Sequence, residues 1–171
     1  AIFGPNGDQP LDAAIVAEKF AALAAEIGKA QGKSAPDPRA VAEGFLRVAV
    51  ANMANVAALI WQFVPDLNWA GFYRMVDGGL VLGPFVGKPA CIRIALGQGV
   101  CGTAAATGKT QLVPDVHAFP GHIACDAQSR SELVVPVLRD GQVIAVIDLD
   151  SPTPARFTPD DARGIEHAGR D

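Results

Sequence analysis

The chain has 171 residues, a net charge of −4 and a pI near 5.3, and half of its residues are hydrophobic. This length fits one domain with a buried core. An acidic chain lacks the basic face that binds nucleic acid or an anionic membrane surface, and no apolar run reaches the roughly 18 residues of a membrane span. Because the first ten residues show no signal-peptide pattern, we expect a cytoplasmic protein without nucleic-acid or membrane partners.

Two helices are predicted at the N-terminal end. Residues 11–29 repeat apolar side chains at the spacing of a helix with one buried face. A second helix is predicted from Pro38, with Asp37 as its N-cap, to about Val64, where Pro65 ends it. One side of this second helix comprises Phe45, Val48, Asn52, Val56, Leu59 and Phe63.

From Asn68 onward the apolar period becomes two, which is typical of β-strands. The stretches NWAGFYRMV and GLVLGPF predict a hairpin, and ACIRI predicts a third short strand. A short helix, GVCGTAAATG, and a fourth strand, TQLVPDV, follow. SELVVPVLRDGQVIAVIDLDS predicts two more strands joined by a turn at residues 139–141, and FTPDDARGIEHAG predicts a last helix capped by Thr158.

This order of elements indicates the fold class. Six strands, mostly linked as hairpins, with helices before, between and after them, predict an α+β domain with an antiparallel sheet. The long segment 88–130 interrupts the hairpins with little regular structure. A segment of this kind is usually a binding or catalytic region, so we expect the site there.

Three acidic residues are predicted to meet at one end of the sheet. Asp148 and Asp150 are two residues apart on one strand and therefore project from the same face. The turn at 139–141 places Glu132, at the start of the partner strand, close to both. Three neighbouring carboxylates bind a cation or retain a proton near neutral pH. The alternative is that the strand ends there and both aspartates reach water.

The three cysteines match no disulfide framework or zinc-ribbon spacing. Cys125 lies among polar loop residues between His122 and Asp126, where a nucleophilic thiol is accessible and a nearby imidazolium lowers its pKa. Cys91 begins a strand after a loop, and two loop-proximal thiols can serve as an attacking and a resolving pair. Cys101, in a small-residue helix, suits burial. Buried inert thiols are the alternative for each of the three.

The histidines and aromatic residues each have two interpretations. His117 and His122 flank a turn beside Cys125, but their spacing matches no standard zinc site, so we expect hydrogen-bonded loop histidines and no metal. Trp69 and Tyr73 share one face of the first strand. They are either core residues or an apolar wall for a small ligand.

The motifs NWAGFY, LGPFVGKPACIRI, GQGVCGTA, DVHAFPGHIACD, SELVVP and IDLDS, in this order, closely resemble the free methionine-(R)-sulfoxide reductase family, which is built on a GAF domain. The resemblance covers residues 68–157, and the cysteine set and the GHIACD loop distinguish this family from other GAF domains. It implies a six-stranded antiparallel sheet with flanking helices. The implied single GAF domain comprises an extension at 1–10, two helices at 11–64, the sheet and catalytic pocket at 68–157 and a C-terminal helix at 158–171.

The resemblance also implies an activity, the reduction of the R epimer of free methionine sulfoxide. Cys125 would attack the sulfoxide sulfur and become a sulfenic acid, Cys91 would form a disulfide with it, and Cys101 would be a back-up thiol. Thioredoxin would reduce the disulfide, so no bound cofactor is implied. GAF domains often pair through helices, and the alanine-rich first helix offers a surface for a homodimer.

The same activity implies roles for the acids and aromatics. A sulfoxide reacts once its oxygen is protonated or strongly hydrogen-bonded, and general acid assistance contributes roughly 10²–10⁴ in rate. Repulsion among Glu132, Asp148 and Asp150 would keep a proton on at least one of them, while the others pair with the ammonium group of a free amino acid. Trp69, with Tyr73 beside it, would hold the ε-methyl group of the substrate.

Two other functions fit the same sequence. The fold alone permits a non-catalytic GAF module that binds a small regulatory ligand such as a nucleotide. The thiols also permit a redox sensor in which a disulfide between Cys91 and Cys125 is itself the signal. An assay of sulfoxide consumption separates both from the enzyme.

Overall fold

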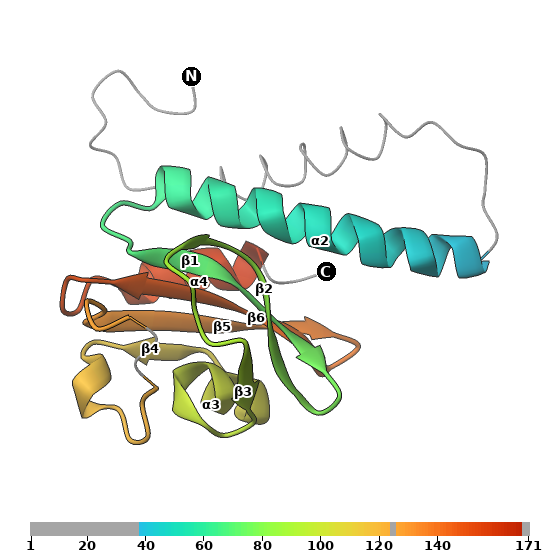
Figure 1. The fold of residues 1–171 in the computed structure, drawn as a ribbon. Helices are drawn as coiled ribbons and strands as arrows, with labels where there is room; N and C mark the ends of the chain where they lie inside the picture. The colour runs from blue at the N-terminus through green and yellow to red at the C-terminus, as the bar shows by residue number, and fades with distance from the viewer. Residues whose placement is uncertain (1–37, 124–125, 169–171) are drawn as a thin grey trace, which may run out of the picture.

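The computed structural model of the chain describes residues 38–123 and 126–168. Its centre is one six-stranded antiparallel sheet in the order β3-β2-β1-β6-β5-β4 (Figure 1). The strands are β1 (Trp69–Val76), β2 (Gly79–Gly87), β3 (Arg93–Ala95), β4 (Gln111–Val113), β5 (Ser131–Arg139) and β6 (Gln142–Ser151). The helices are α2 (Pro38–Phe63), α3 (Gly99–Thr107), α4 (Pro159–Ala168) and a 3-10 turn, η1 (Val116–Ala118). The predicted α+β fold with six antiparallel strands is confirmed.

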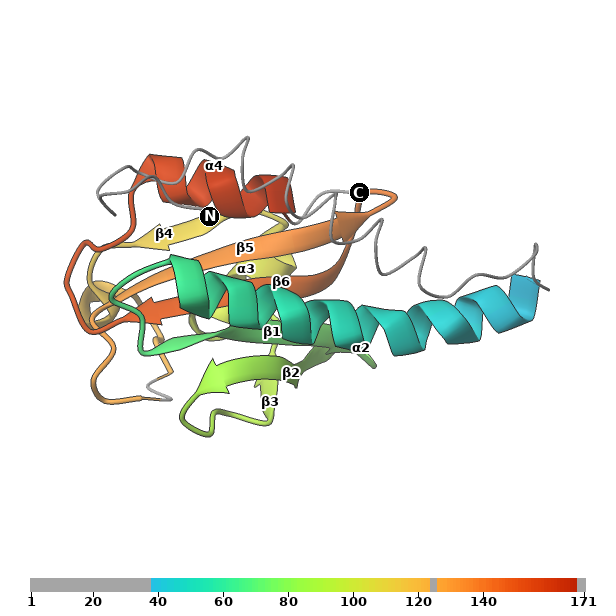
Figure 2. The same ribbon diagram turned by 90° about the horizontal axis from the view of Figure 1, so that it is seen from above.

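Helices cover both faces of this sheet. Figure 2 shows α2 and α4 over the same face, and Figure 1 shows α3 on the opposite one. The core under α2 and α4 consists of Ala57, Ile60, Ala70, Phe72, Leu133, Val135, Ile147, Leu149, Phe157 and Ala162. The core under α3 consists of Trp69, Tyr73, Leu80, Ile94, Val100, Cys101, Ala104, Ala105, Val113, Val116, Val134 and Val146.

Helix α2 begins at Pro38 and ends at Phe63, close to its predicted limits. Within its described side chains, the most buried are Ala57 and Ile60, which lie beside the predicted stripe and not on it. Met53, Val56 and Val64 pack against the same core, so the buried stripe of α2 is turned slightly from the predicted one. The predicted helix at 11–29 lies outside the described residues, as do the Asp37 cap and the side chains before residue 49. No helix in the described part of the chain is long and apolar enough to cross a membrane.

The hairpin turns form as predicted. Asp140 and Gly141 join β5 to β6, and both have positive φ angles, as do residues 77–78 between β1 and β2. Positive φ at both central residues matches the right-handed twist of the flanking strands, and Gly adopts it without a Cβ clash. The turn pairs Arg139 with Gln142, and a register shift between Val137 and Leu138 then places Glu132 opposite Asp150.

The third strand is shorter than predicted. ACIRI was expected to be a strand as a whole, but β3 covers only Arg93–Ala95. Cys91 therefore lies in the segment before the strand and is partly buried. The segment still contacts the sheet, because the backbone N–H of Leu82 donates to the carbonyl of Ile92 at 3.0 Å.

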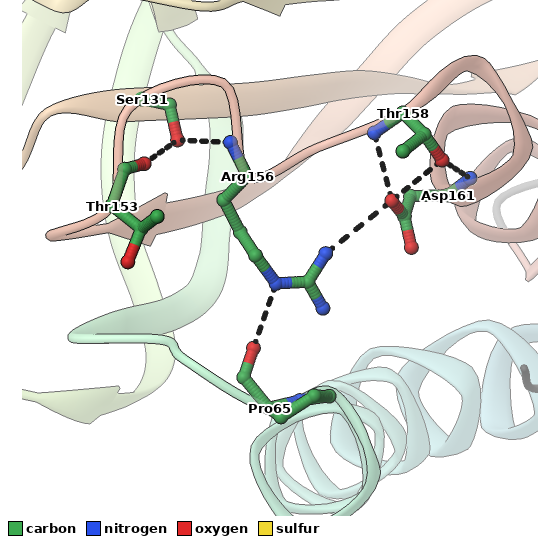
Figure 3. Close-up of polar contacts among 6 residues, drawn as sticks. All are labelled: Pro65, Ser131, Thr153, Arg156, Thr158 and Asp161. Atoms are coloured by element: carbon green, nitrogen blue, oxygen red, sulfur yellow. Dashed lines mark hydrogen bonds and ion pairs between the residues drawn. The ribbon is translucent and has the colours of Figure 1, made fainter. Parts of the chain in front are cut away.

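Helix α4 has the predicted cap. The Thr158 Oγ1 accepts a hydrogen bond from the N–H of Asp161 at 3.2 Å, and Asp161 Oδ2 accepts from the N–H of Thr158 at 2.8 Å (Figure 3). These reciprocal bonds satisfy two backbone donors that the helix itself leaves unpaired. Pro159 occupies the first helical position, where its missing N–H costs nothing.

Polar contacts fix the connection from β6 to α4 over the end of the sheet. Ser131 Oγ donates to the carbonyl of Thr153 at 2.7 Å and accepts from the N–H of Arg156 at 3.3 Å. The Arg156 guanidinium donates to the carbonyl of Pro65 at 3.0 Å and pairs with Asp161 at 3.4 Å (Figure 3). This residue therefore links the end of α2 to the start of α4.

Candidate active site

The three predicted acids meet on the face of the sheet that α3 covers. Glu132 on β5 pairs with Asp150 on β6, and Asp150 pairs in turn with Trp69 on β1. Asp148 is two residues along β6 and pairs with Gly71. Since cross-strand neighbours point to the same side, the carboxylates and the indole border one cavity. The cavity lining includes Trp69, Tyr73, Cys101, His122, Glu132, Asp148 and Asp150.

Two of these acids are almost wholly removed from solvent. Asp148 is 6% exposed and Glu132 is 7% exposed, while Asp150 is partly buried. The interpretation that the strand ends and both aspartates reach water is therefore wrong for Asp148. Strand β6 continues to Ser151, and α3 packs over this face.

Burial controls the protonation of this acid cluster. It raises the pKa of Glu132 well above its ordinary value, and the charges of Asp148 and Asp150 raise it further. Burial and then the charge of Asp148 raise the pKa of Asp150. Burial raises the pKa of Asp148 to about 7, although hydrogen bonds from Cys101 and Glu132 lower it in part. The cluster therefore retains at least one proton at neutral pH.

One oxygen of the cluster finds no donor in the part of the chain that the structure describes. Asp148 Oδ1 is buried and has no hydrogen-bond partner among the described residues. An acceptor left in this state costs free energy, because it has lost its hydration without a replacement. A ligand that brings a donor or a cation to Asp148 recovers this cost.

The thiols differ in their surroundings. Cys101 is buried in α3, as predicted, and its Sγ lies 4.0 Å from Glu132 Oε1. Burial, and then the charges of Asp148 and Glu132, raise the pKa of the Cys101 thiol well above its ordinary value, so it is protonated at neutral pH. Cys125 lies outside the described residues, so its approach to the acids stays a prediction.

His122 is a cavity residue that the sequence analysis did not assign to the substrate site. Its Nε2 lies 3.9 Å from Glu132 Oε2, and both side chains are largely buried. Burial, and then the charge of His117, lower the pKa of His122, which favours the neutral imidazole. His117 instead hydrogen-bonds Asp115, with 3.0 Å between Nδ1 and Oδ1, as expected for a loop histidine.

The residues that could hold a metal do not include the two loop histidines, for which no metal was expected. Among the described residues, Cys101, Glu132 and Asp148 offer ligand atoms that all lie within 4.8 Å of one another. Neither His117 nor His122 belongs to this group. The sequence spacing could not suggest it, because its members come from α3, β5 and β6.

Trp69 and Tyr73 form the aromatic wall of the cavity, and the ring of Phe85 also stacks on Trp69. Trp69 is 3% exposed, and its ring centroid lies 5.9 Å from that of Tyr73 and 5.3 Å from that of Phe85. Trp69 and Tyr73 belong to the core, as the first interpretation predicts, and they also line the cavity, so their contact with a small ligand stays a prediction. Gly71 makes room for the indole, because a Cβ there would lie 2.7 Å from Trp69 Cη2 and 2.3 Å from Phe85 Cβ.

A polar network connects two segments at the rim of the cavity. Lys88 Nζ lies 3.1 Å from Asp126 Oδ2 and donates to Gln128 Oε1 at 2.7 Å. Asn68 Nδ2 donates to Asp126 Oδ2 at 3.2 Å and to Ser129 Oγ at 3.0 Å. The hydrogen bond from the Gln128 N–H, with those from Lys88 and Asn68, lowers the pKa of Asp126 and keeps it charged.

Comparison with known proteins agrees with this architecture. The GAF domain family model matches residues 37–170. Free methionine-R-sulfoxide reductase of Escherichia coli strain K12 is 53% identical over 116 residues, which are 68% of this chain and 70% of that protein. The X-ray structure of free methionine-R-sulfoxide reductase from Neisseria meningitidis in complex with its substrate is 43% identical with a TM-score of 0.68, over 81% of this chain and 89% of that one.

A second solved structure, fRMsr of Staphylococcus aureus in complex with substrate, gives a TM-score of 0.75 at 36% identity, covering 94% of this chain and 93% of that one. Fold and family match together define the class of protein, a GAF domain with a buried acidic cavity. Within that class, the chain belongs to the free methionine-R-sulfoxide reductase family. The family expected from the sequence motifs is confirmed.

Proposed function

We propose that this chain reduces free L-methionine-(R)-S-oxide to methionine. The observation that supports this most is the cavity under α3, where Glu132, Asp148 and Asp150 lie beside the aromatic wall of Trp69 and Tyr73. A small amino acid matches such a cavity if its charged amine lies at the carboxylates and its methyl sulfoxide end lies at the aromatic rings. Relatives with that name, and related structures described as substrate complexes, support the same substrate class.

The acid cluster recognises the free amino acid. An ammonium group brings three donors, and Asp148 Oδ1 is a buried acceptor without a donor among the described residues. A peptide nitrogen carries no such charge, so a peptide-bound residue would leave the carboxylates unpaired. Trp69 would contact the ε-methyl group and so distinguish the two sulfur epimers.

The chemical step transfers one oxygen and two electrons. The Cys125 thiolate attacks the sulfoxide sulfur while a protonated acid of the cluster donates to the sulfoxide oxygen. The oxygen leaves with the Cys125 sulfur as a sulfenic acid, and methionine is released as the thioether. The sulfoxide is thereby reduced by two electrons, and the thiol is oxidised by two.

Recycling then needs a second thiol and an external reductant. Cys91 attacks the sulfenic sulfur, which releases water and forms a Cys91–Cys125 disulfide. A dithiol of the thioredoxin type reduces this disulfide, so that no bound cofactor takes part. Cys101, whose thiol is buried and protonated, suits a reserve role better than either of these steps.

The test is consumption of each methionine sulfoxide epimer, free or within a peptide, in the presence of a thiol reductant. We expect only the free R epimer to disappear. If no form is consumed, the proposal is wrong, and a ligand-binding module or a redox sensor remains. Single turnover separates the thiols, since Cys91→Ser should release one equivalent of methionine and be recycled by thioredoxin only as far as Cys101 replaces Cys91, whereas Cys125→Ser should release none.

The acids have their own test. Of Glu132→Gln, Asp148→Asn and Asp150→Asn, at least one should lower kcat/KM by roughly 10²–10⁴, the usual contribution of a general acid. A variant that loses ammonium binding should raise KM, and one that loses the proton donor should lower kcat. Near-normal values for all three would refute the role of the cluster.

A further inference from the structure

The acid cluster and Cys101 together form a ligand set that transition metals prefer. Cys101, Glu132 and Asp148 are all buried, and their ligand atoms lie within 4.8 Å of one another. A second observation comes from Asp148, which is 94% buried and whose Oδ1 has no hydrogen-bond partner among the described residues. A substrate amine has no need of the sulfur atom, whereas a borderline metal ion binds thiolate and carboxylate together.

We propose that Cys101, Glu132 and Asp148 bind a divalent transition-metal ion of the Zn²⁺ type, with a fourth position open to the cavity. This inference goes beyond the proposed reduction. It assigns to Cys101 a function that none of the steps above requires.

The geometry needs only a small adjustment. Tetrahedral zinc with bonds of about 2.3 Å to sulfur and about 2.0 Å to oxygen separates the two ligand atoms by about 3.5 Å. Cys101 Sγ and Glu132 Oε1 are 4.0 Å apart, a distance that rotation of the carboxylate can shorten. His122 Nε2 lies 3.9 Å from Glu132 Oε2 and offers a nitrogen ligand beside the set. Ca²⁺ and Mg²⁺ fit less well, because they require six or more oxygen ligands.

Metal binding would exclude the substrate. The ion occupies the carboxylates of Glu132 and Asp148, to which the proposed function assigns the ammonium group and the proton transfer. The thiol proton of Cys101 is released when the sulfur becomes a ligand. Zn²⁺ should therefore raise KM for the sulfoxide without lowering kcat at saturating substrate, a consequence that rests on the proposed function.

The direct test uses Co²⁺ as a spectroscopic probe of the whole chain, with no sulfoxide present. We expect a near-ultraviolet band from thiolate-to-Co²⁺ charge transfer, which Zn²⁺ removes by displacement. Cys101→Ser should abolish the band or weaken Co²⁺ binding more than about tenfold, since even outer-shell changes cost 10- to 100-fold in metal affinity. The matched control is Cys91→Ser, which removes a thiol outside the ligand set and should keep the band.

A second variant tests the site even if Cys101→Ser fails to fold. Asp148→Asn keeps the thiol and should weaken Co²⁺ binding while circular dichroism shows an unchanged fold. Absence of any band, or an unchanged band in Cys101→Ser, would overturn the inference. Failure of reductase activity with a Cys101-dependent band would overturn only the proposed function, and activity without the band would overturn only the metal site.

Discussion

The two faces of the sheet use the same strands for opposite purposes. On β5 and β6 the residues under α2 and α4 are apolar, with Leu133, Ile147 and Leu149 almost fully buried. Their immediate neighbours under α3 include Glu132, Asp148 and Asp150, beside the apolar Val134 and Val146. Side chains alternate between the two faces along each strand. An apolar core that stabilises the fold and an acid cluster that destabilises it therefore come from adjacent residues of the same strands.

This difference shows where free energy of folding is gained and where it is lost. The apolar face gains from removing hydrocarbon from water, at roughly 25 cal/mol per Å². The other face loses part of this gain, because it buries carboxyl groups and leaves an oxygen of Asp148 without a partner within residues 38–123 and 126–168. Functional sites commonly break the local rules that the rest of the fold obeys.

The largest stability effect is expected on the apolar face. Leu149→Ala should lower the free energy of unfolding by about 2–5 kcal/mol, the usual range for a buried Leu truncated to Ala. KM for the sulfoxide should stay unchanged, because Leu149 points away from the cavity. Urea unfolding followed by circular dichroism measures the first quantity and steady-state kinetics the second. A large change in KM with little loss of stability would show that the two faces are not separable.

On the acidic face, stability should depend on pH. The pKa of Asp148 is raised from 3.8 to about 7 in the folded chain, so the stability present below pH 4 is lost as the pH rises through 7. At about 1.4 kcal/mol per pKa unit, the loss is on the order of 4 kcal/mol at most.

Asp148→Asn removes this titration. The variant should therefore be more stable than the parent at pH 8 and lose less stability between pH 5 and pH 8, while its activity falls. Urea unfolding at the two pH values measures the effect, and Asp140→Asn, in the exposed turn, is the control. The same pH dependence in parent and Asp148→Asn would contradict the assignment of the loss to this carboxyl.

A smaller effect is expected where the backbone approaches the aromatic wall. Gly71→Ala should cost about 1–3 kcal/mol, because the added Cβ would overlap Phe85 and the Trp69 ring. The displaced indole should raise KM more than it lowers kcat. Gly79→Ala is the matched control, since its Cβ would meet only the Ile94 carbonyl at an ordinary 3.5 Å. Equal effects in the two variants would exclude a special role for Gly71.

The smallest effect is expected at the cap of α4, which covers the apolar face. Thr158→Ala should lower the free energy of unfolding by about 1 kcal/mol, because the N–H of Asp161 loses its acceptor. Thr158→Ser keeps the hydroxyl and should restore most of the loss, as measured by thermal unfolding. A change in KM in either variant would indicate that α4 influences the cavity.

The sequence predicted the features that depend on local chemistry. The turn at Asp140 and Gly141, the end of α3 at the left-handed Gly108 and the cap at Thr158 all need particular residues at particular backbone angles. Features of this kind can be predicted without knowing the other contacts of the fold, because they depend only on residues close together in the sequence. The hairpin brought β5 beside β6, but the pairing of Glu132 with Asp150 also needs the register shift between Val137 and Leu138, which the strand pattern did not predict.

The features that the sequence did not predict depend on segments distant along the chain. His122 reaches Glu132 through a loop without periodicity. Phe85 lies opposite Gly71 and beside Trp69 because the register of the predicted β1–β2 hairpin shifts between Gly71 and Tyr73, which the strand pattern did not show. The burial of Asp148 is decided by how α3 packs on the sheet, which the β6 sequence does not contain. The position of Cys125, on which the proposed chemistry depends, stays a prediction.

Trp69 in the aromatic wall can also serve as an intrinsic fluorescence probe. The chain has two tryptophans. Trp61 lies on α2 and is 40% exposed, whereas Trp69 borders the cavity and is 3% exposed. Replacement of Trp61 by Phe would leave a single indole whose fluorescence arises beside the acids. Emission from that one ring would then record occupancy of the cavity in real time, independently of turnover.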